Sequence, residues 1–497
     1  MATPRGVIKR GQTRVWLMES GAGPAVAPEY MGVMRAGAIA WDFGEGSNIE
    51  IPADDQYNAF QVVDSLPGTK GKPTIPLTAR YTDQLSELLR MARRGCTNDL
   101  QVHMGACEDL QDFTGGWRKI VALDSFSLTN YGTDDLGALE SGENGTVNEN
   151  ANASGLDLYE IKRLSLAEIC GVSVVQEVID VTYGDIKSCG GDCGLPSDGC
   201  EKLFGLVKTV GGSPGLGAQV VFSADGGSTC DASPITTLPA NQEPSQLAKL
   251  GTYLVVVAEG STSHHYALLD DILAGTEVWQ EVAAGYTNAP RCIFALKAGY
   301  SWIGGAGGYI YSLGNPNDSP VVLDAGAATA QNLNAIHAFD ETHILAVGAA
   351  NAVVHSTDGT TFAAVTGPAP AVALNCCWMK SETEWWVGSA AGNLYYTRDS
   401  GVTWTAKAFP GSGAGVVQDV LFVTSQVGYL SHSTAAPAGR ILRTIDGGYQ
   451  WYVLPEGTGS IPANDRITRL AHCGDPNVIL GGGLADNGTD GILIKGS

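Results

Sequence analysis

The chain repeats one short turn motif, and this repeat limits its possible folds more than any other feature. The pattern is a hydroxyl residue, any residue, Asp, then glycine and, a few residues later, an aromatic residue. Four copies begin at Ser223, Ser356, Thr397 and Thr444, each directly after a short run of β-branched or aromatic residues. The copies are separated by one interval of roughly 40–50 residues or by about three such intervals, always after a strand, and this spacing predicts an array of similar β units.

The residue types of the motif suit a β-hairpin turn. An Asp carboxylate accepts hydrogen bonds from backbone N–H groups, and glycine adopts backbone angles that other residues resist. The hydroxyl residue supports the same network, and the aromatic residue packs between neighbouring sheets. We therefore predict a structural role for Ser223, Asp225, Gly227, Ser356, Asp358, Gly359, Thr397, Asp399, Gly401, Trp404, Thr444, Asp446, Gly448 and Trp451. Cys230 stands at the aromatic position of the first copy, and the second copy is one residue shorter and ends at Phe362.

Weaker matches between the four copies extend the repeat. Residues that end the third strand of each unit are predicted at Ser223, Ala267, Ser312, Ser356, Thr397, Thr444 and Lys495. Their spacing is typical of four-stranded propeller blades. The sequence therefore predicts a seven-bladed β-propeller over residues 201–497. Because the chain stops after a third strand, we expect a strand near Leu203–Val210 to complete the ring and remove its exposed edges.

This region resembles the Asp-box (BNR) propellers, the fold shared by sialidases, sortilin-type receptors and the photosystem assembly-factor family. A sialidase of this fold requires three clustered arginines, an Asp acid/base and a Tyr–Glu pair near the axis. The region holds six arginines, and Arg398, Arg440 and Arg443 lie within or beside the turn motifs. We expect no convergent polar residues at the starts of the innermost strands. The predictions are no enzyme activity, no catalytic or cofactor-binding residue, no metal ligand and no cofactor.

Residues 1–200 differ from the repeat region. Alternating apolar residues predict a β-sandwich or barrel, and one amphipathic helix is expected at Thr82–Arg94, where Leu85, Leu88 and Leu89 share a face. A long acidic loop without aromatic residues is predicted at Thr133–Asp157. The fold class is thus mainly β, with an amino-terminal domain at 1–200 and a propeller at 201–497.

Residues 1–190 resemble phage major tail (tail-tube) proteins. The likeness lies in IPLTARYTDQLSELLRMARRGCTNDLQVHMG, GGWRKIVALDSFSLTNYGTDDLGALE and YEIKRLSLAE, which look like the strand–helix–strand core and inter-subunit loop of that family. The resemblance implies a viral structural protein of the virion tail, assembled in the host cytoplasm. It implies homo-oligomeric, hexameric stacked rings around a channel through which dsDNA passes without specific binding. The propeller would then decorate the outside of the tail tube.

Charge agrees with that interpretation. The chain has 29 basic and 52 acidic residues and a formal net charge of −23. An acidic protein is poorly suited to electrostatic capture of nucleic acid but suits a surface along which DNA slides. The amino terminus, MATPRGVIKRGQTRVW, lacks the apolar segment of a signal peptide, and no membrane span is expected.

Two further questions stay open in the sequence. The alternative function is a non-enzymatic propeller that binds glycan or protein, as an assembly factor or adhesin does. Aromatic residues of blades five and six could stack on sugars, or they could form the core between blades. Cys189, Cys193 and Cys200 lie close together and could form a disulfide or stay free thiols; a metal site is the less favoured alternative, since zinc needs a fourth ligand. The other eight cysteines are predicted to be buried.

Overall fold

The computed structural model divides the chain into two compact units. One comprises residues 1–163 and 189–195, and the other residues 164–188 and 196–497. The structure describes residues 13–19, 23–34, 49–52, 62–66, 74–80, 98–104, 119–133, 148–154, 157–170, 176–184, 200–209, 218–239, 242–283, 285–297, 299–433, 439–455, 466–485 and 491–496. The boundary predicted at residue 200 therefore lies too late, because the second unit begins at Leu164. No helix within the described ranges is long and apolar enough to cross a membrane.

The amino-terminal unit is built on one antiparallel sheet with the strand order β6-β1-β2-β5-β8-β7-β9, in which β6 also pairs with β7. Leu100, Val102, Ile120 and Leu123 are fully buried on the paired strands β6 and β7. A separate hairpin pairs β3 with β4. The strands are β1 (Thr13–Glu19), β2 (Glu29–Met34), β3 (Ile49–Pro52), β4 (Val62–Leu66), β5 (Thr74–Arg80), β6 (Asn98–Met104), β7 (Lys119–Thr133), β8 (Asn148–Ser154) and β9 (Asp157–Ile161), with a 3-10 turn, η1, at Gly23–Ala25.

The sequence predicted a helix and a long loop in this unit. The helix expected at Thr82–Arg94 lies outside the described residues, so the sandwich or barrel with one packed helix stays a prediction. The loop expected at Thr133–Asp157 is wrong in part, because β8 occupies Asn148–Ser154 and pairs with both β5 and β7. Ladder hydrogen bonds come from the backbone, so the polar segment NENANAS can form a strand without the apolar alternation that marks most strands.

The second unit contains seven four-stranded antiparallel sheets, as the repeat spacing predicted. The first three are β11 (Gln176–Tyr183), β12 (Leu203–Thr209), β13 (Gln219–Ser223), β14 (Asp231–Pro234); β15 (Glu243–Leu250), β16 (Tyr253–Glu259), β17 (His264–Leu268), β18 (Gln280–Val282); and β19 (Pro290–Lys297), β20 (Tyr300–Gly305), β21 (Tyr309–Ser312), β22 (Val321–Ala325). The next two are β23 (Leu333–Ala338), β24 (Ile344–Gly348), β25 (Val353–Ser356), β26 (Ala363–Val365); and β27 (Leu374–Met379), β28 (Trp385–Ser389), β29 (Leu394–Thr397), β30 (Thr405–Lys407). The last two are β31 (Val416–Phe422), β32 (Gly428–Ser433), β33 (Gly439–Thr444), β34 (Tyr452–Val453); and β35 (Arg466–Ala471), β36 (Ile479–Leu484), β37 (Gly491–Gly496), β10 (Leu166–Ile169).

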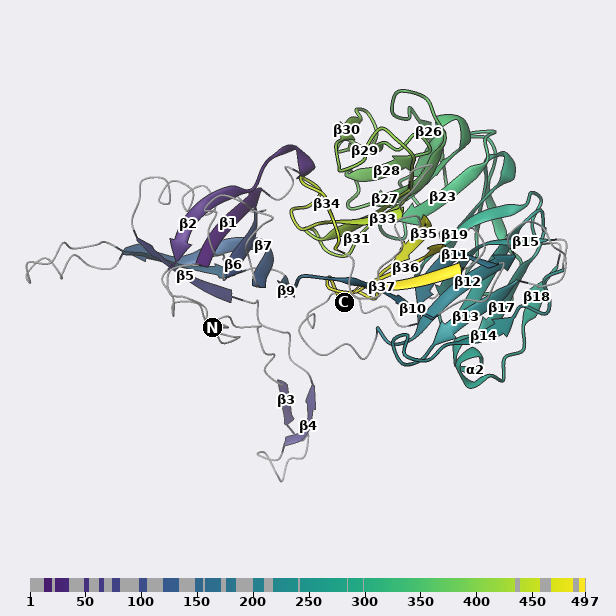
Figure 1. The fold of residues 1–497 in the computed structure, drawn as a ribbon, viewed down its shortest axis with the longest axis horizontal. Coiled ribbons are helices and arrows are strands. Elements are labelled where there is room, and N and C mark those ends of the chain that lie inside the picture. Colours follow the sequence, from purple (N-terminus) through teal and green to yellow (C-terminus); the bar gives the residue numbers. More distant parts are fainter. Residues whose placement is uncertain are drawn as a thin grey trace, which may run out of the picture. The chain divides into compact units, whose positions relative to one another are not determined.

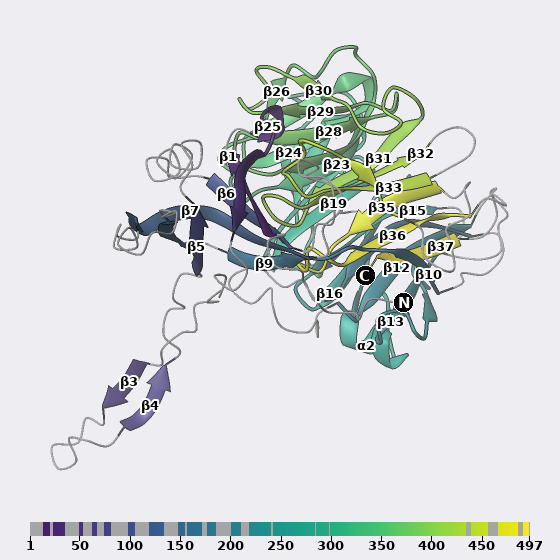
Figure 2. The same cartoon turned by 60° about the vertical axis from the view of Figure 1, so that its left-hand side comes forward.

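These sheets form a closed ring, which is a β-propeller. The innermost strands β11, β15, β19, β23, β27, β31 and β35 contact one another in that order, and β35 contacts β11 again. The teal, green and yellow blades follow one another around the ring in Figures 1 and 2. A short helix, α2 (Leu269–Ala274), follows β17, and 3-10 turns η4 (Ala306–Gly308) and η5 (Ala349–Asn351) join second to third strands. Every third strand ends within one residue of its predicted position.

The strand that closes the ring is not the predicted one. β10 (Leu166–Ile169) is the outermost strand of blade seven and pairs with β37, from Leu166 opposite Gly496 to Ile169 opposite Leu493. Leu203–Thr209 is instead the second strand of blade one, next to β11. β11 lies among the stretches expected to belong to the amino-terminal domain. The prediction failed because strand pairing across more than 300 residues leaves no local mark in the sequence.

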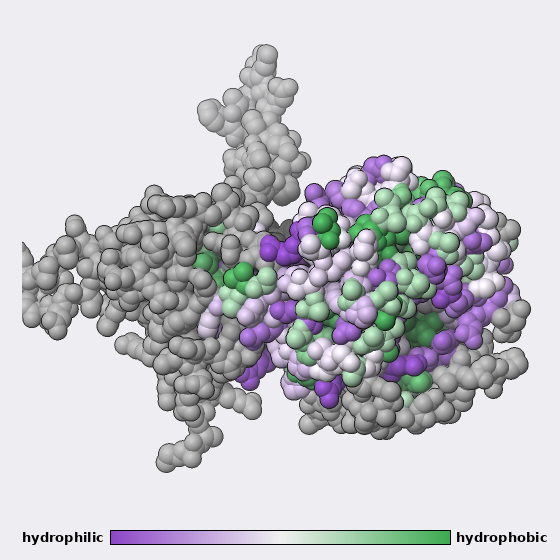
Figure 3. Space-filling model, turned by 90° about the horizontal axis from the view of Figure 1, so that it is seen from above, coloured by the Kyte–Doolittle hydropathy of each residue, from purple (hydrophilic) through white to green (hydrophobic). Residues whose placement is uncertain are grey.

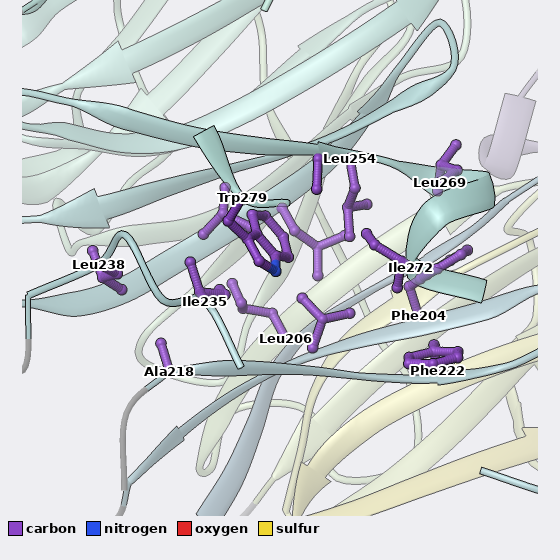
Figure 4. Packing of buried hydrophobic residues seen from close by; sticks show 14 of the residues in the cluster. Phe204, Leu206, Ala218, Phe222, Ile235, Leu238, Leu254, Leu269, Ile272 and Trp279 are labelled. Carbon is purple, nitrogen blue, oxygen red and sulfur yellow. The ribbon is translucent and has the colours of Figure 1, made fainter. Parts of the chain in front are cut away.

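The cores lie between neighbouring blades. Figure 4 shows the cluster between blades one and two, where Phe204, Leu206 and Phe222 face Leu254, Ile272 and Trp279. The Trp279 indole N–H donates to Ser233 Oγ at 3.0 Å. Burying large apolar side chains on both faces of each sheet supplies the main stabilisation of such a ring.

Two disulfides lie within the described residues, and Cys200 is paired with neither Cys189 nor Cys193. Cys200 is bonded to Cys473 and Cys170 to Cys230, with Cα–Cα distances of 5.4 and 5.6 Å. These four are therefore not free buried thiols, and Cys189 and Cys193 lie outside the described residues. Cys292, Cys376 and Cys377 are free and buried, as predicted.

Candidate binding site at the propeller axis

The four turn motifs lie between the third and fourth strands of blades one, four, five and six, and each is a closed hydrogen-bond network. In the first turn, Gly227 N–H donates to Ser223 Oγ at 2.9 Å, and Thr229 N–H donates to Asp225 Oδ1 at 2.8 Å. The Thr229 backbone N–H is the main reason that the pKa of Asp225 falls to about 2. Gly227 has a φ of 97°, a region that favours glycine.

The other three turns repeat this geometry. Gly401 N–H donates to Thr397 Oγ1 and Gly448 N–H to Thr444 Oγ1, both at 2.9 Å. In the shorter second turn the donor is Gly359, three residues after Ser356 rather than four. The carboxylates of Asp358, Asp399 and Asp446 each accept a backbone N–H from the following residues. These networks satisfy hydrogen-bonding groups within each turn, which is in line with the structural role predicted for the motif residues.

The aromatic position of the motif also serves packing. Trp451 contacts Trp386 and Phe422, with ring centroids 6.1 and 5.9 Å apart. Trp404 donates its indole N–H to Thr366 O at 2.8 Å. In the first turn, Cys230 takes this position and is bonded to Cys170. Trp385, Trp386, Tyr395 and Tyr396 are buried, so these aromatic residues of blade five form core and are not available to stack on sugar.

Each innermost strand carries one β-bulge near its start. The bulges define a second set of residues at equivalent positions in the blades, distinct from the turn motifs. The extra residue follows a buried Val, Pro, Leu or Ile and is itself partly exposed in all seven blades. We call these seven residues the axial ring: Ile179, Ser245, Arg291, Asn334, Asn375, Gln418 and Thr468. Six are polar, so the expectation of no convergent polar residues at the starts of the innermost strands is wrong.

Members of the axial ring bind the next blade. Asn334 Nδ2 donates to Leu374 O at 2.9 Å, and Asn375 Nδ2 donates to Val417 O at 3.3 Å. Thr468 Oγ1 donates to Val178 O at 2.9 Å and so joins blade seven to blade one. Each Asn thus commits its N–H₂ group to the scaffold and keeps its carbonyl oxygen as an acceptor.

The residues directly after the bulges also join blades. Asp180 Oδ2 accepts Leu247 N–H at 2.8 Å, Gln246 Oε1 accepts Ile293 N–H at 2.9 Å, and Asp419 Oδ2 accepts Leu470 N–H at 2.9 Å. Burial raises the pKa of Asp180 to about 7, against the opposing charge of Arg469. Burial likewise raises the pKa of Asp419. Their oxygens are occupied by backbone donors, which makes both carboxyl groups structural.

Charged residues border the axial ring on the side of blades seven, one, two and three. Arg466 forms an ion pair with the buried Glu177, and Lys208 lies 3.9 Å from Glu177 and 4.0 Å from Glu243. Arg291, itself a member of the axial ring, pairs with Glu259. The side chains of Glu243 and Arg466 are 63% and 45% exposed, so both signs of charge are presented to solvent.

The turn motifs and the axial ring lie at opposite ends of the blades. The hairpin that follows an innermost strand contacts the turn motif of its own blade, as shown by Gly359 N–H donating to Thr342 O and Gly447 N–H to Gln426 O. The axial ring lies near the start of the same strands. On the face of the second unit drawn in Figure 3, hydrophilic and hydrophobic residues mix in small areas.

The arginines do not form the cluster that a sialidase requires. Arg291, Arg466 and Arg469 lie on innermost strands, and each faces a carboxyl group of the protein itself. Within the described ranges, one group of side chains could surround a metal ion, namely Asp340, His343 and Glu382. Asp340 Oδ1 already accepts the backbone N–H groups of Thr342 and His343, as in an ordinary turn.

No protein-family model and no curated protein sequence matches this chain. Solved structures similar to it include YCF48 bound to D1 peptide, with 13% identity, a TM-score of 0.49, and coverage of 67% of this chain and 95% of that one. Streptogramin B lyase has 11% identity, a TM-score of 0.49, and coverage of 66% and 97%. The RRP9 WD40 repeats have 10% identity, a TM-score of 0.46, and coverage of 67% and 100%. The propeller assignment rests on the sheet pairings described above.

Proposed function

We propose that the propeller is a non-catalytic recognition module that binds a polypeptide partner across the axial ring. The observation that carries this proposal is the run of seven bulged innermost strands, which present six polar side chains in partly exposed positions. Bulges re-aim side chains and are frequent beside functional sites. We further propose that the four turn motifs are Asp boxes that hold the blades behind this surface.

The chemistry of the ring favours a polypeptide. The free carbonyl oxygens of Asn334 and Asn375 accept hydrogen bonds, as peptide N–H groups require. Glu243 and Arg466 offer charges of opposite sign at the border, which suits side chains of a folded or extended protein. Each of the three guanidinium groups described on innermost strands is engaged by a carboxyl group of the protein, which disfavours binding of a sialic acid carboxylate by these arginines.

This function predicts that charge changes at the border weaken binding. The full-length chain and the double variant Glu243→Ala/Arg466→Ala are applied to a random peptide array and to a glycan array. We expect peptide binding by the wild type and at least a roughly tenfold loss in the variant, since losing exposed interface charges of this kind costs on the order of 1 kcal/mol each.

Val402→Ser is the matched control. Val402 lies in the turn motif of blade five, at the opposite end of the blades, and is 81% exposed. Its substitution should leave peptide binding unchanged. Binding only to the glycan array, or equal loss of peptide binding in the control, would refute a polypeptide site at the axial ring.

A second function is favoured by the amino-terminal unit. It has a seven-stranded sheet of its own and a separate β3–β4 hairpin, a combination in line with the tail-tube resemblance of residues 1–190. We propose that this unit assembles the chain into stacked rings of a virion tail, with dsDNA in the channel and the propeller outside. Negative-stain microscopy of the full-length protein should show rings or tubes with an axial hole, whereas monodisperse monomers over a wide concentration range would contradict it.

A further inference from the structure

Both disulfides of the propeller cross one seam, the junction between blades seven and one. Cys170 directly follows the closing strand β10, and its partner Cys230 lies in the turn motif of blade one. Cys200 precedes β12 in blade one, and its partner Cys473 follows β35 in blade seven. The described residues place no disulfide at any of the other six junctions.

Among the described strands, this seam is the one place where a blade is not continuous in the chain. Blades one to six each take four consecutive strands, but blade seven takes β10 from the start of the unit. β10 is held to β37 over four residue pairs. A four-residue strand has little pairing energy of its own, so closure of the ring depends on what else holds this junction.

Non-covalent contacts place the cysteines before they are bonded. Lys495 Nζ on β37 donates to Gly226 O at 3.1 Å, and Thr468 Oγ1 donates to Val178 O at 2.9 Å. Gly227 packs so closely on β10 that an added Cβ would lie 2.7 Å from Ile169 Cδ1. The reduced ring can therefore close, and its thiols then face each other.

The remaining described cysteines do not compete. Cys292, Cys376 and Cys377 are buried on innermost strands β19 and β27. Burial raises the pKa of Cys292 to about 12, which disfavours the reactive thiolate. Among the cysteines that the structure describes, oxidation is thus expected only at the two seam pairs.

We propose that the two disulfides are a covalent lock on the ring, formed after the chain leaves a reducing compartment. Each pair of thiols reacts with a small-molecule disulfide of the glutathione class. One cysteine thiolate attacks this oxidant and releases one thiol, and the second cysteine then displaces the other thiol as the bond between the two cysteines forms. Disulfides persist outside the reducing cytosol, on secreted proteins and on virion surfaces. The protein therefore works in oxidising surroundings, whatever its propeller binds.

Thiol state and stability test this lock on the full-length protein. Protein made in a reducing cytosol is alkylated before and after treatment with oxidised glutathione and is then mapped by mass spectrometry. We expect Cys170, Cys200, Cys230 and Cys473 to be alkylated before oxidation and protected after it. The unfolding midpoint should rise on oxidation by roughly 5 °C or more.

Matched variants separate the lock from general redox effects. Replacing all four seam cysteines by Ala should abolish the oxidation-dependent rise, while Cys292→Ala should retain it. Because thiol mapping uses the unmutated chain, the proposal stays testable if the quadruple variant fails to fold. Seam cysteines that remain alkylated in folded, oxidant-treated protein would overturn it, as would an unfolding midpoint that is the same in both redox states.

Discussion

Trp386→Ala should lower the free energy of unfolding by about 3–5 kcal/mol, the cost typical of removing a large aromatic side chain from a packed core. Trp386 is fully buried on β28. Its ring centroid lies 5.2 Å from those of Tyr396 and Phe422, so it fills the space between blades five and six. Its indole N–H donates to the buried Glu384 at 3.0 Å, and that bond would be lost as well.

The turn motif of blade six is built around this side chain. Gly448 has a φ of 99°, and a Cβ added there would lie 2.5 Å from the Trp386 ring. Truncating Trp386 therefore removes the surface on which the turn packs. Because the remaining backbone cannot collapse into the space, most of the cavity cost should persist.

Denaturant unfolding of the full-length chain measures this effect. Val402→Ala is the control: its side chain is 81% exposed, so we expect a change within about 0.5 kcal/mol. Trp386→Phe should recover part of the loss, since a smaller ring still fills some of the space. A loss below about 1 kcal/mol in Trp386→Ala would show that the two blades do not depend on this contact.

The turn motif made the propeller predictable because it acts locally. In the copy that begins at Thr397, the Thr397 hydroxyl and the Asp399 carboxylate accept backbone N–H groups from within four residues, so the turn closes on itself. Each copy therefore marks in the sequence where the third strand of its blade ends. The same locality explains the failure at the seam, because the pairing of Leu166 with Gly496 is set by the tertiary fold and by no neighbouring residue.

The axial ring was missed for a different reason. Its seven positions hold residues as unlike as Ile179, Arg291 and Asn375, so no residue type repeats. What repeats is the buried apolar residue just before each bulge, such as Val178, Leu374 and Val417. Aligning the blades on that residue, rather than on the turn motif, would have brought the polar positions into one column.

Two copies of the turn motif should respond to pH in opposite directions. Burial raises the pKa of Asp446 in blade six to about 6, with a smaller opposing effect from the Gln450 N–H. The folded protein then holds this proton more tightly than the unfolded chain does. Its contribution to stability is full below about pH 4 and is lost as pH rises through about 6. Asp225 in blade one is exposed, and its lowered pKa gives a contribution that is present above about pH 4 and lost as pH falls toward 2.

Asparagine substitutions expose this difference. Asp446→Asn keeps an acceptor for Gln450 N–H and removes the buried charge. Because the pKa of Asp446 is raised from 3.8 to about 6, the variant should be more stable than the wild type by about 3 kcal/mol above pH 6. Near pH 4 the two should be equal. Asp225→Asn should be less stable than the wild type at neutral pH, and the gap should narrow as pH falls.

Unfolding free energies measured from about pH 3 to about pH 8 compare the two variants directly. Stability profiles that change with pH in the same direction for both variants would contradict the buried environment of Asp446 and the exposed environment of Asp225. Opposite profiles would mean that the shared sequence of these turns fixes their hydrogen bonds, while the packing of each blade decides whether the carboxylate charge stabilises the fold. Blade six, where Asp446 is buried, would then gain stability when this carboxylate loses its charge, whereas blade one would lose stability if the exposed Asp225 lost its charge.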